Sequence, residues 1–263
     1  LGVALAVFAA VTERILLGAG VVLLPLRHPS LVAKQAASLD YVSGGRLLLG
    51  VGVGGDGGQD FEAAGVPLAE RGSRADEGIA ALRRLFADRP ASFSGRHYHF
   101  QDVSIEPAPV QPGGPPILVG GRSEAAQRRA GTLGDGWLPY LISPRTFAAG
   151  VERVRVHALA VDRDPAELRH GLVAFARVEE DGAHAREAAR EHLSQRYGMR
   201  FEPHHVEHLC VAGTPEECSA RVQAYADAGA SHLALNPTVD QDGFLSQVER
   251  LRTIVAPARE VRT

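Results

Sequence analysis

Short apolar runs alternate along the chain with longer segments whose apolar residues recur at the spacing of a helix. The runs predict strands at residues 15–24, 46–53, 117–119, 137–138, 172–178 and 232–235. The longer segments predict helices at residues 1–12, 29–41, 74–86, 124–133, 145–161, 183–197, 215–228 and 244–255. This alternation indicates a parallel sheet covered by helices, either open and doubly wound or closed as a (β/α)8 barrel.

The first helix is rich in Ala and Val without a breaker, so we expect it to be buried. The helix at 29–41 has a candidate cap in Ser30, and Gly44-Gly45 follows its end. Its predicted inward face consists of Leu31, Val32, Ala36 and Leu39. Together with the strands on either side it forms a strand–helix–strand unit, which is the unit of parallel sheets.

The strand at 46–53 ends in a run of glycines, within the stretch SGGRLLLGVGVGGDGG at residues 43–58. Gly50, Gly52 and Gly55 satisfy the dinucleotide pattern G-x-G-x-x-G, which requires a helix directly after the last glycine. Asp56-Gly57-Gly58 follows instead and is poor helix material. The stretch therefore predicts a strand end that faces a ligand, because glycines let the backbone approach one closely.

Composition narrows the class of protein. With 263 residues, 45% hydrophobic and 22% charged, the chain is typical of a globular protein, and its net charge of −3 gives no reason to expect nucleic acid or an anionic membrane as a partner. Two cysteines are too few for a disulfide framework, and no signal peptide or spanning run is visible, so we expect a cytoplasmic protein. The chain begins at Leu1 in what reads as the middle of a domain.

Several segments together carry a family resemblance, among them TERILLGAGVVLLPLRHPSLVAKQAASLDYVSGGRLLLGVGVGG, PAPVQPGGPPILVGGRSEAAQRRAGTLGDGW and GTPEECSARVQAYADAGASHLAL. They resemble the bacterial luciferase-like monooxygenase superfamily, and most closely its deazaflavin (coenzyme F420)-dependent oxidoreductases. The resemblance implies a single TIM-type (β/α)8 barrel over residues 1–263, with an excursion at about residues 56–115. Since periodicity gives about six strands, we expect the first two barrel strands to be absent from an N-terminally incomplete chain.

The resemblance also implies a cofactor site at the carboxyl ends of the strands. A cis peptide at Gly20-Val21 would support the cofactor ring, whereas the sequence alone favours a plain strand glycine at Gly20. Val53, Gly54 and Gly55 would lie beside the polyol tail and contact it through backbone only. A phosphate would bind where a strand meets a helix, at Gly120, Gly121, Arg122 and Ser123, although Ser123 could simply cap that helix.

Two further residues are candidates for the substrate cavity. Trp137 corresponds to a position near the cavity in the family, although a lone tryptophan is more often core. His28 follows the carboxyl end of a strand, where barrel active sites lie. Glu202, His204, His205 and His208 are of metal-binding types but lack a metal-site pattern, so we expect no metal.

The resemblance favours an oxidoreductase that transfers a hydride between coenzyme F420 and a small organic substrate. The alternatives are an FMN-dependent monooxygenase and a relative that binds the cofactor without catalysis. A homodimer is compatible with each of these functions. A Rossmann-type dehydrogenase ranks last, because no acidic residue ends a following strand at the required spacing.

Overall fold

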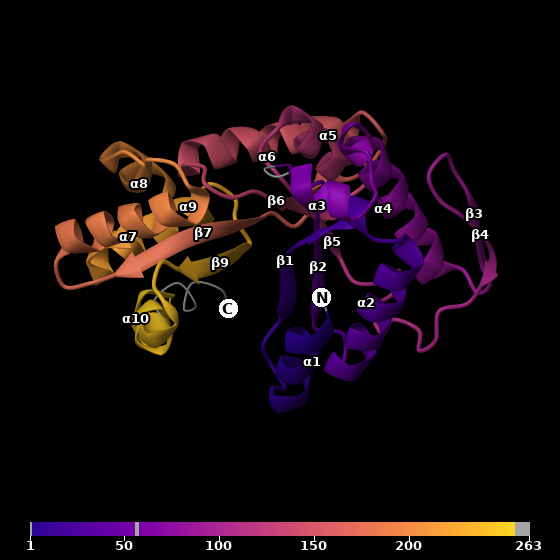
Figure 1. Ribbon diagram of the computed structural model, residues 1–263, viewed down its shortest axis with the longest axis horizontal. Helices are drawn as coiled ribbons and strands as arrows, with labels where there is room; N and C mark the ends of the chain where they lie inside the picture. The colour runs from indigo at the N-terminus through magenta and orange to yellow at the C-terminus, as the bar shows by residue number, and fades with distance from the viewer. Residues whose placement is uncertain (1, 56–57, 256–263) are drawn as a thin grey trace. The chain divides into compact units, whose positions relative to one another are not determined.

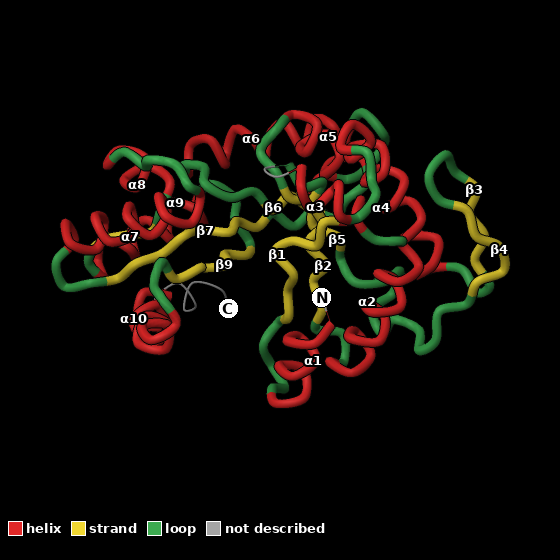
Figure 2. The backbone as a smooth tube through the Cα atoms, in the orientation of Figure 1, coloured by secondary structure: helices red, strands yellow, loops and turns green. Residues whose placement is uncertain are grey.

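The computed structural model describes residues 2–55 and 58–255 and contains two compact units (Figures 1 and 2). One unit comprises Leu1–Leu138 with Val154–Leu168, and the other comprises Pro139–Arg153 with Arg169–Thr263. Both are built from parallel strands and helices, so the α/β class is confirmed. Within the described residues, no helix is long and apolar enough to cross a membrane.

The first unit contains a parallel sheet of four strands in the order β1-β2-β5-β6. These strands span Leu17–Leu23, Leu47–Gly52, Ile117–Gly120 and Gly136–Leu138. Its helices are α1 (Gly2–Val11), α2 (Pro29–Ser43), α3 (Gly58–Ala63), α4 (Arg71–Ala87) and α5 (Glu124–Thr132), and α6 (Pro144–Leu159) belongs partly to each unit. An antiparallel hairpin of β3 (Ala91–Ser94) and β4 (His99–Val103) follows α4. The alternation of residues 91–106 around Ser94-Gly95 predicts a short hairpin there.

The second unit contains a parallel sheet in the order β8-β7-β9, with β7 at Gly171–Val178, β8 at Val211–Gly213 and β9 at His232–Pro237. Its helices are α7 (Gly182–Tyr197), α8 (Pro203–Leu209), α9 (Pro215–Asp227) and α10 (Phe244–Val255). One cluster of its core consists of Leu141, Phe175, Ala189, Leu193, Phe201, Val206 and Cys210. The pattern in the sequence did not predict α8 and β8.

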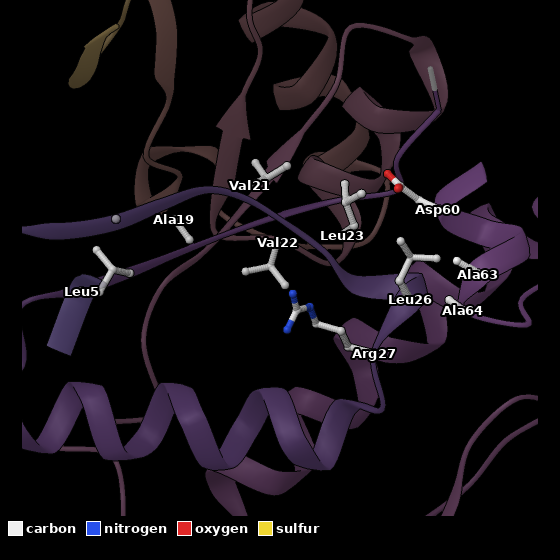
Figure 3. Close-up of a pocket in the computed structure, with 11 residues that line it drawn as sticks. Leu5, Ala19, Val21, Val22, Leu23, Leu26, Arg27, Asp60, Ala63 and Ala64 are labelled. Carbon is white, nitrogen blue, oxygen red and sulfur yellow. The ribbon is translucent and has the colours of Figure 1, made fainter. Parts of the chain in front are cut away.

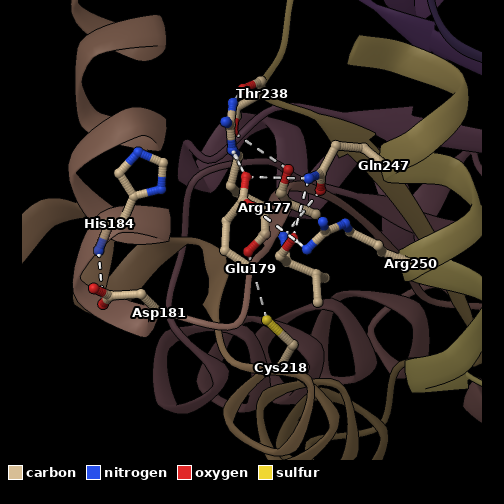
Figure 4. Close-up of polar contacts among 10 residues, drawn as sticks. Arg177, Glu179, Asp181, His184, Cys218, Thr238, Gln247 and Arg250 are labelled. Atoms are coloured by element: carbon tan, nitrogen blue, oxygen red, sulfur yellow. Dashed lines mark hydrogen bonds and ion pairs between the residues drawn. The ribbon is translucent and has the colours of Figure 1, made fainter.

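A buried polar network closes the carboxyl end of β7 (Figure 4). The Gln247 side-chain amide accepts a hydrogen bond from Val178 N–H and donates one to Val178 O, both at 3.0 Å. Arg177 donates to Glu179 at 2.8 Å and to Thr238 O at 2.9 Å. Gln247 thus gives this strand end the partners that a neighbouring strand would otherwise supply.

Local signals at the helix ends behave largely as the sequence predicts. Gly44 takes the left-handed conformation after α2, with φ of 66°. The run Gly213-Thr214-Pro215 predicts Thr214 as the cap of the helix that follows, and Thr214 forms a reciprocal capping box with Glu217 at the start of α9. The cap of α2 was predicted wrongly, because His28 and not Ser30 occupies that position and its Nδ1 accepts from Ser30 N–H.

Two predictions of burial were wrong. Helix α1 forms where expected, but Ala9 is its only buried residue among those described. On α2, Leu31 is 63% exposed, whereas Val32, Ala36 and Leu39 are buried as predicted. Both errors arise because an apolar pattern shows which residues can face a core, while neighbouring elements decide which of them do.

Candidate active site

The carboxyl half of β1 carries a bulge at the place that the family resemblance indicates. The Gly20–Val21 peptide bond is cis. The pairing of β1 with β2 shifts between Ala19 and Val22. This interruption turns the side chain of Val21 onto the same face as glycines of the neighbouring strands.

Three glycines of that face are required by the bulge itself. A Cβ at Gly52 would lie 2.6 Å from Val21 Cγ2, and one at Gly120 would lie 3.0 Å from Val21 Cγ1. A Cβ at Gly50 would lie 2.0 Å from the Ala19 carbonyl oxygen, which is backbone and cannot turn away. The glycine run therefore makes room for the neighbouring strand, which pattern analysis of a single strand could not reveal.

The opposite face of β2 is packed core. Leu47, Leu49 and Val51 alternate with the glycines and are at most 2% exposed. The chain leaves this strand through Val53, Gly54 and Gly55. Gly54 has a φ of 70°, and a Cβ there would lie 3.0 Å from the Phe61 ring, whereas a Cβ at Gly55 would meet nothing within 4 Å. Of these three residues, only Gly55 is exposed, and Val53 and Gly54 are half-buried.

The segment Gly120-Gly121-Arg122-Ser123 joins β5 to α5. Ser123 is the N-cap, and its hydroxyl oxygen accepts from Ala126 N–H at 3.3 Å, so the capping role is confirmed. The hydroxyl hydrogen of Ser123 stays available to a further acceptor, because Ala126 uses only an oxygen lone pair. Gly121 has a φ of 112°, which favours glycine.

The side chain of Trp137 is hydrogen-bonded to this segment. Its side chain is fully buried, and its indole Nε1–H donates to the Gly121 carbonyl at 2.8 Å. The structure thus places Trp137 in the core of the first unit, as the more common role of a lone tryptophan suggests. It fixes the carbonyl of the segment from which α5 begins.

A cavity of about 730 Å³ lies along β1 and reaches α3 (Figure 3). This volume is within the range of roughly 300–1,000 Å³ that small-molecule sites occupy. Most of the residues that line it are apolar, with Val21, Val22 and Leu23 from β1. Arg27 and Asp60 contribute the charged groups, and Figure 3 shows the Arg27 guanidinium pointing toward Val22. No sequence signal points to Asp60, whereas Arg27 directly precedes the predicted His28.

His28 lies beside this cavity in sequence but not among its lining residues. Its Nδ1 is 2.7 Å from Ser30 Oγ, and its ring meets the Tyr98 ring edge-on at a centroid distance of 5.6 Å. Burial raises the pKa of Tyr98, and the nearby Arg74 opposes that shift. His28 therefore has a structural role at the start of α2.

The histidines of α8 make hydrogen bonds within their own helix or to the residue before it. The His205 Nδ1 accepts from Glu202 N–H at 3.1 Å, and His208 Nδ1 is 2.8 Å from His204 O. Among the residues that the structure describes, no group of three His, Cys, Asp or Glu side chains could hold a metal ion.

Comparison with known proteins places the chain in a family. Residues 2–232 match the family model described as luciferase-like monooxygenase. An uncharacterized protein of Mycobacterium tuberculosis is 45% identical over 51% of this chain, and the match covers 45% of that protein, just under half of its length. An F420-dependent glucose-6-phosphate dehydrogenase of Kineococcus radiotolerans is 28% identical over 91% of this chain and 77% of that enzyme.

Solved structures share the fold. An F420-dependent secondary alcohol dehydrogenase superimposes with a TM-score of 0.82 at 18% identity, covering 95% of this chain and 84% of the other. The monooxygenase RslO1 from Streptomyces bottropensis gives a TM-score of 0.80 at 24% identity, covering 97% and 82%. At these identities the likeness concerns the fold alone. With the family match over residues 2–232, it follows that the chain belongs to the luciferase-like monooxygenase family.

Proposed function

We propose that this chain is an oxidoreductase that transfers a hydride between coenzyme F420 and a small organic substrate. The observation that carries the proposal is the sheet face on which the Val21 side chain lies over Gly52 and Gly120. Named relatives add support, because F420-dependent glucose-6-phosphate dehydrogenases align with 91% of this chain. A 5,10-methylenetetrahydromethanopterin reductase of Methanolobus tindarius aligns with 87% of it.

The described residues around Val21 fit the ring of coenzyme F420. Gly50, Gly52 and Gly120 keep this part of the sheet face free of side chains of their own, so Val21 is the side chain that covers it. In the proposal, Val21 and the backbone of the bulge support one face of the ring. Val53, Gly54 and Gly55 would meet the polyol tail with backbone groups.

The start of α5 fits the phosphate that both F420 and FMN carry. Unpaired N–H groups and the helix dipole favour an anion at such a terminus. Ser123 can donate its hydroxyl hydrogen while Ala126 N–H occupies one lone pair. In the proposal, Gly120 and Gly121 let the backbone approach the phosphate, and Arg122 adds a positive charge nearby.

The cofactor, when bound, supplies the two-electron hydride chemistry, and the chain binds, orients and shields the reactants. The cavity along β1 is proposed to admit the substrate, with Leu23 and Leu26 excluding water and Arg27 and Asp60 meeting its polar groups. His28 does not line this cavity and its Nδ1 is engaged by Ser30, so we propose that it holds the start of α2 and does not contact the substrate. Trp137 would act as a positioning residue through Gly121.

We also propose that the parallel strands belong to one TIM-type barrel domain over residues 1–263, which is the fold that the family resemblance implies. An FMN-dependent monooxygenase is the second candidate function, favoured by the family model and by the structural likeness to monooxygenases. A relative that binds the cofactor without catalysis is the third. All three predict cofactor binding and differ in which cofactor binds and in turnover.

Titration of the purified chain with F420 and, separately, with FMN tests the proposal. We expect saturable binding of F420, followed by its fluorescence change, and F420 turnover with members of a panel of alcohols and sugar phosphates. Binding of FMN without binding of F420 would overturn the proposal in favour of the monooxygenase. Tight F420 binding without turnover on any substrate would favour the inactive relative.

A further inference from the structure

A second cavity, of about 390 Å³, lies in the first unit where α4 meets the carboxyl end of α5. Arg83, Arg84 and Arg163 line it, and among the described lining residues Asp135 is the one acid. This arginine cavity therefore has an excess of two positive charges, although the whole chain has a net charge of −3. Its volume is within the range of roughly 300–1,000 Å³ that small-molecule sites occupy.

Two of the arginines converge on one carboxylate oxygen. Asp135 Oδ1 lies 2.7 Å from Arg83 Nη2 and 3.8 Å from Arg163 Nη2. The other oxygen of Asp135 accepts from Ile117 N–H at 2.7 Å, so it is committed to the start of β5. One carboxylate thus faces two guanidinium groups, and the positive charge that it leaves uncompensated attracts a second anion.

The same two arginines hold the carboxyl end of α5, and this role uses only part of their hydrogen-bonding capacity. Arg163 Nη1 donates to Gly131 O at 2.8 Å and to Gly134 O at 2.7 Å. Arg83 Nη2 donates to Leu133 O at 3.3 Å. A guanidinium has five N–H donors. Within the described residues, the Nε and Nη1 donors of Arg83 and the Nε donor of Arg163 have no hydrogen-bond partner.

Arg84 pairs with a different carboxylate. Its Nη1 lies 3.0 Å from Asp88 Oδ2, and the two side chains are 62% and 42% exposed. Exposed ion pairs of this kind are weak, so Arg84 can turn toward an anion in the cavity at little cost. Asp88 is not a lining residue, and counting its charge still leaves the arginine cavity positive.

The arginine cavity is separate from the proposed cofactor site. Ile117 and Asp135 stand at the amino ends of β5 and β6, whereas Gly120 stands at the carboxyl end of β5. At about 3.3 Å per residue, the length of β5 separates the two ends by roughly 10 Å. A ligand in the arginine cavity would therefore bind independently of the cofactor.

Phosphate is the anion that matches these groups. Guanidinium groups bind phosphate through paired N–H···O bonds, and its several oxygens can serve arginines that approach from different elements. A phosphate monoester carries a charge of about −1.5 to −2 at pH 7, close to the excess charge of the cavity. We propose that the arginine cavity binds the phosphate group of a small organic molecule, through Arg83, Arg84 and Arg163.

Isothermal titration calorimetry with phenyl phosphate at low ionic strength, where charges are screened least, tests the site. We expect saturable binding, and binding at least ~10-fold weaker for Arg84→Gln, which removes one guanidinium. Arg200→Gln is the matched control, because Arg200 also has a carboxylate partner, Glu202 at 3.0 Å, and does not line the cavity. Ser123→Asp should leave this binding intact, which distinguishes the arginine cavity from the proposed cofactor site. Benzoate, which has the same ring and a single negative charge, should bind more weakly than phenyl phosphate.

A carboxylate introduced into the cavity provides a second test. Ala80 lines the cavity on α4, three residues before Arg83 and four before Arg84, so a glutamate there would reach both guanidinium groups. Ala80→Glu should weaken phenyl phosphate binding at least ~10-fold more than Ala80→Gln, which adds a similar volume without the charge.

Four results would overturn the proposal. They are the absence of saturable binding to the unaltered chain, equal affinity for benzoate, equal effects of Arg84→Gln and Arg200→Gln, and equal effects of the two substitutions at Ala80. Loss of the binding in Ser123→Asp would place the phosphate at the start of α5 and would also overturn the assignment to the arginine cavity.

Discussion

Replacing Gly52 with alanine tests whether the bulge of β1 imposes the glycine run. The added Cβ would lie 2.6 Å from Val21 Cγ2, well inside the separation of about 3.5–4.0 Å at which carbon atoms attract. Gly52 does not adopt a positive φ, so alanine itself is allowed there. We expect the crowding to lower the free energy of unfolding by about 1–3 kcal/mol.

The sign of this effect should reverse once Val21 is shortened. In a Val21→Ala background the γ-methyl groups are gone, and Gly52→Ala should then raise the free energy of unfolding by about 0.4–1 kcal/mol through the lost entropy of the unfolded chain. Gly50→Ala should stay destabilising in both backgrounds, because its Cβ would meet the Ala19 carbonyl at 2.0 Å.

Urea unfolding of the four variants of this cycle measures the coupling between the two positions. Gly18→Ala is the matched control in β1, since its Cβ would have Leu48 O at 4.0 Å as its nearest neighbour. If Gly52→Ala cost the same with and without the Val21 methyl groups, the glycine would not be required by the neighbouring strand, and the reasoning would be refuted.

Three further predictions concern other parts of the chain. Ser123→Asp should keep the cap of α5, so the free energy of unfolding should stay the same. The new carboxylate should repel the cofactor phosphate and weaken F420 binding ~10-fold or more. Unchanged affinity would show that the phosphate does not bind at this site. Gln247→Leu should lower the free energy of unfolding by about 1–3 kcal/mol, because Val178 N–H loses its partner and Val178 O keeps only the longer bond from Arg250 at 3.4 Å; an unchanged urea midpoint would contradict this. Burial raises the pKa of Cys210 and of Cys218 to about 12, so both thiols stay protonated at pH 8. Neither should react with a thiol reagent until the chain is unfolded. Rapid labelling of the folded chain would show that they are accessible.

The family resemblance located the unusual backbone of the site, and the sequence pattern alone did not. From the run GAGVV alone, Gly20 is better read as a plain strand glycine. The cis peptide at Gly20–Val21 agrees with the resemblance. The contacts of Val21 with Gly52 and Gly120 join three strands that are far apart in the sequence, so no local pattern could have revealed them.

Residue type and local spacing determined the order of the elements. The capping box of Thr214 and Glu217 and the left-handed Gly44 depend on residues a few positions apart, and both were readable from the chain. The hairpin of β3 and β4 was likewise predicted from local alternation around a turn. Such signals are local because the backbone groups that they satisfy lie within one turn.

Only the tertiary structure decided which apolar surfaces are covered. The composition of α1 predicted a buried helix, yet Val3 and Val11 are exposed because no described element lies over them. Short elements such as β8 carry too little periodicity to be read, and this strand exists through its pairing with β7. The sequence therefore determined most of the elements and several of their ends, while burial and the close approach of strands depended on residues brought together from distant parts of the chain.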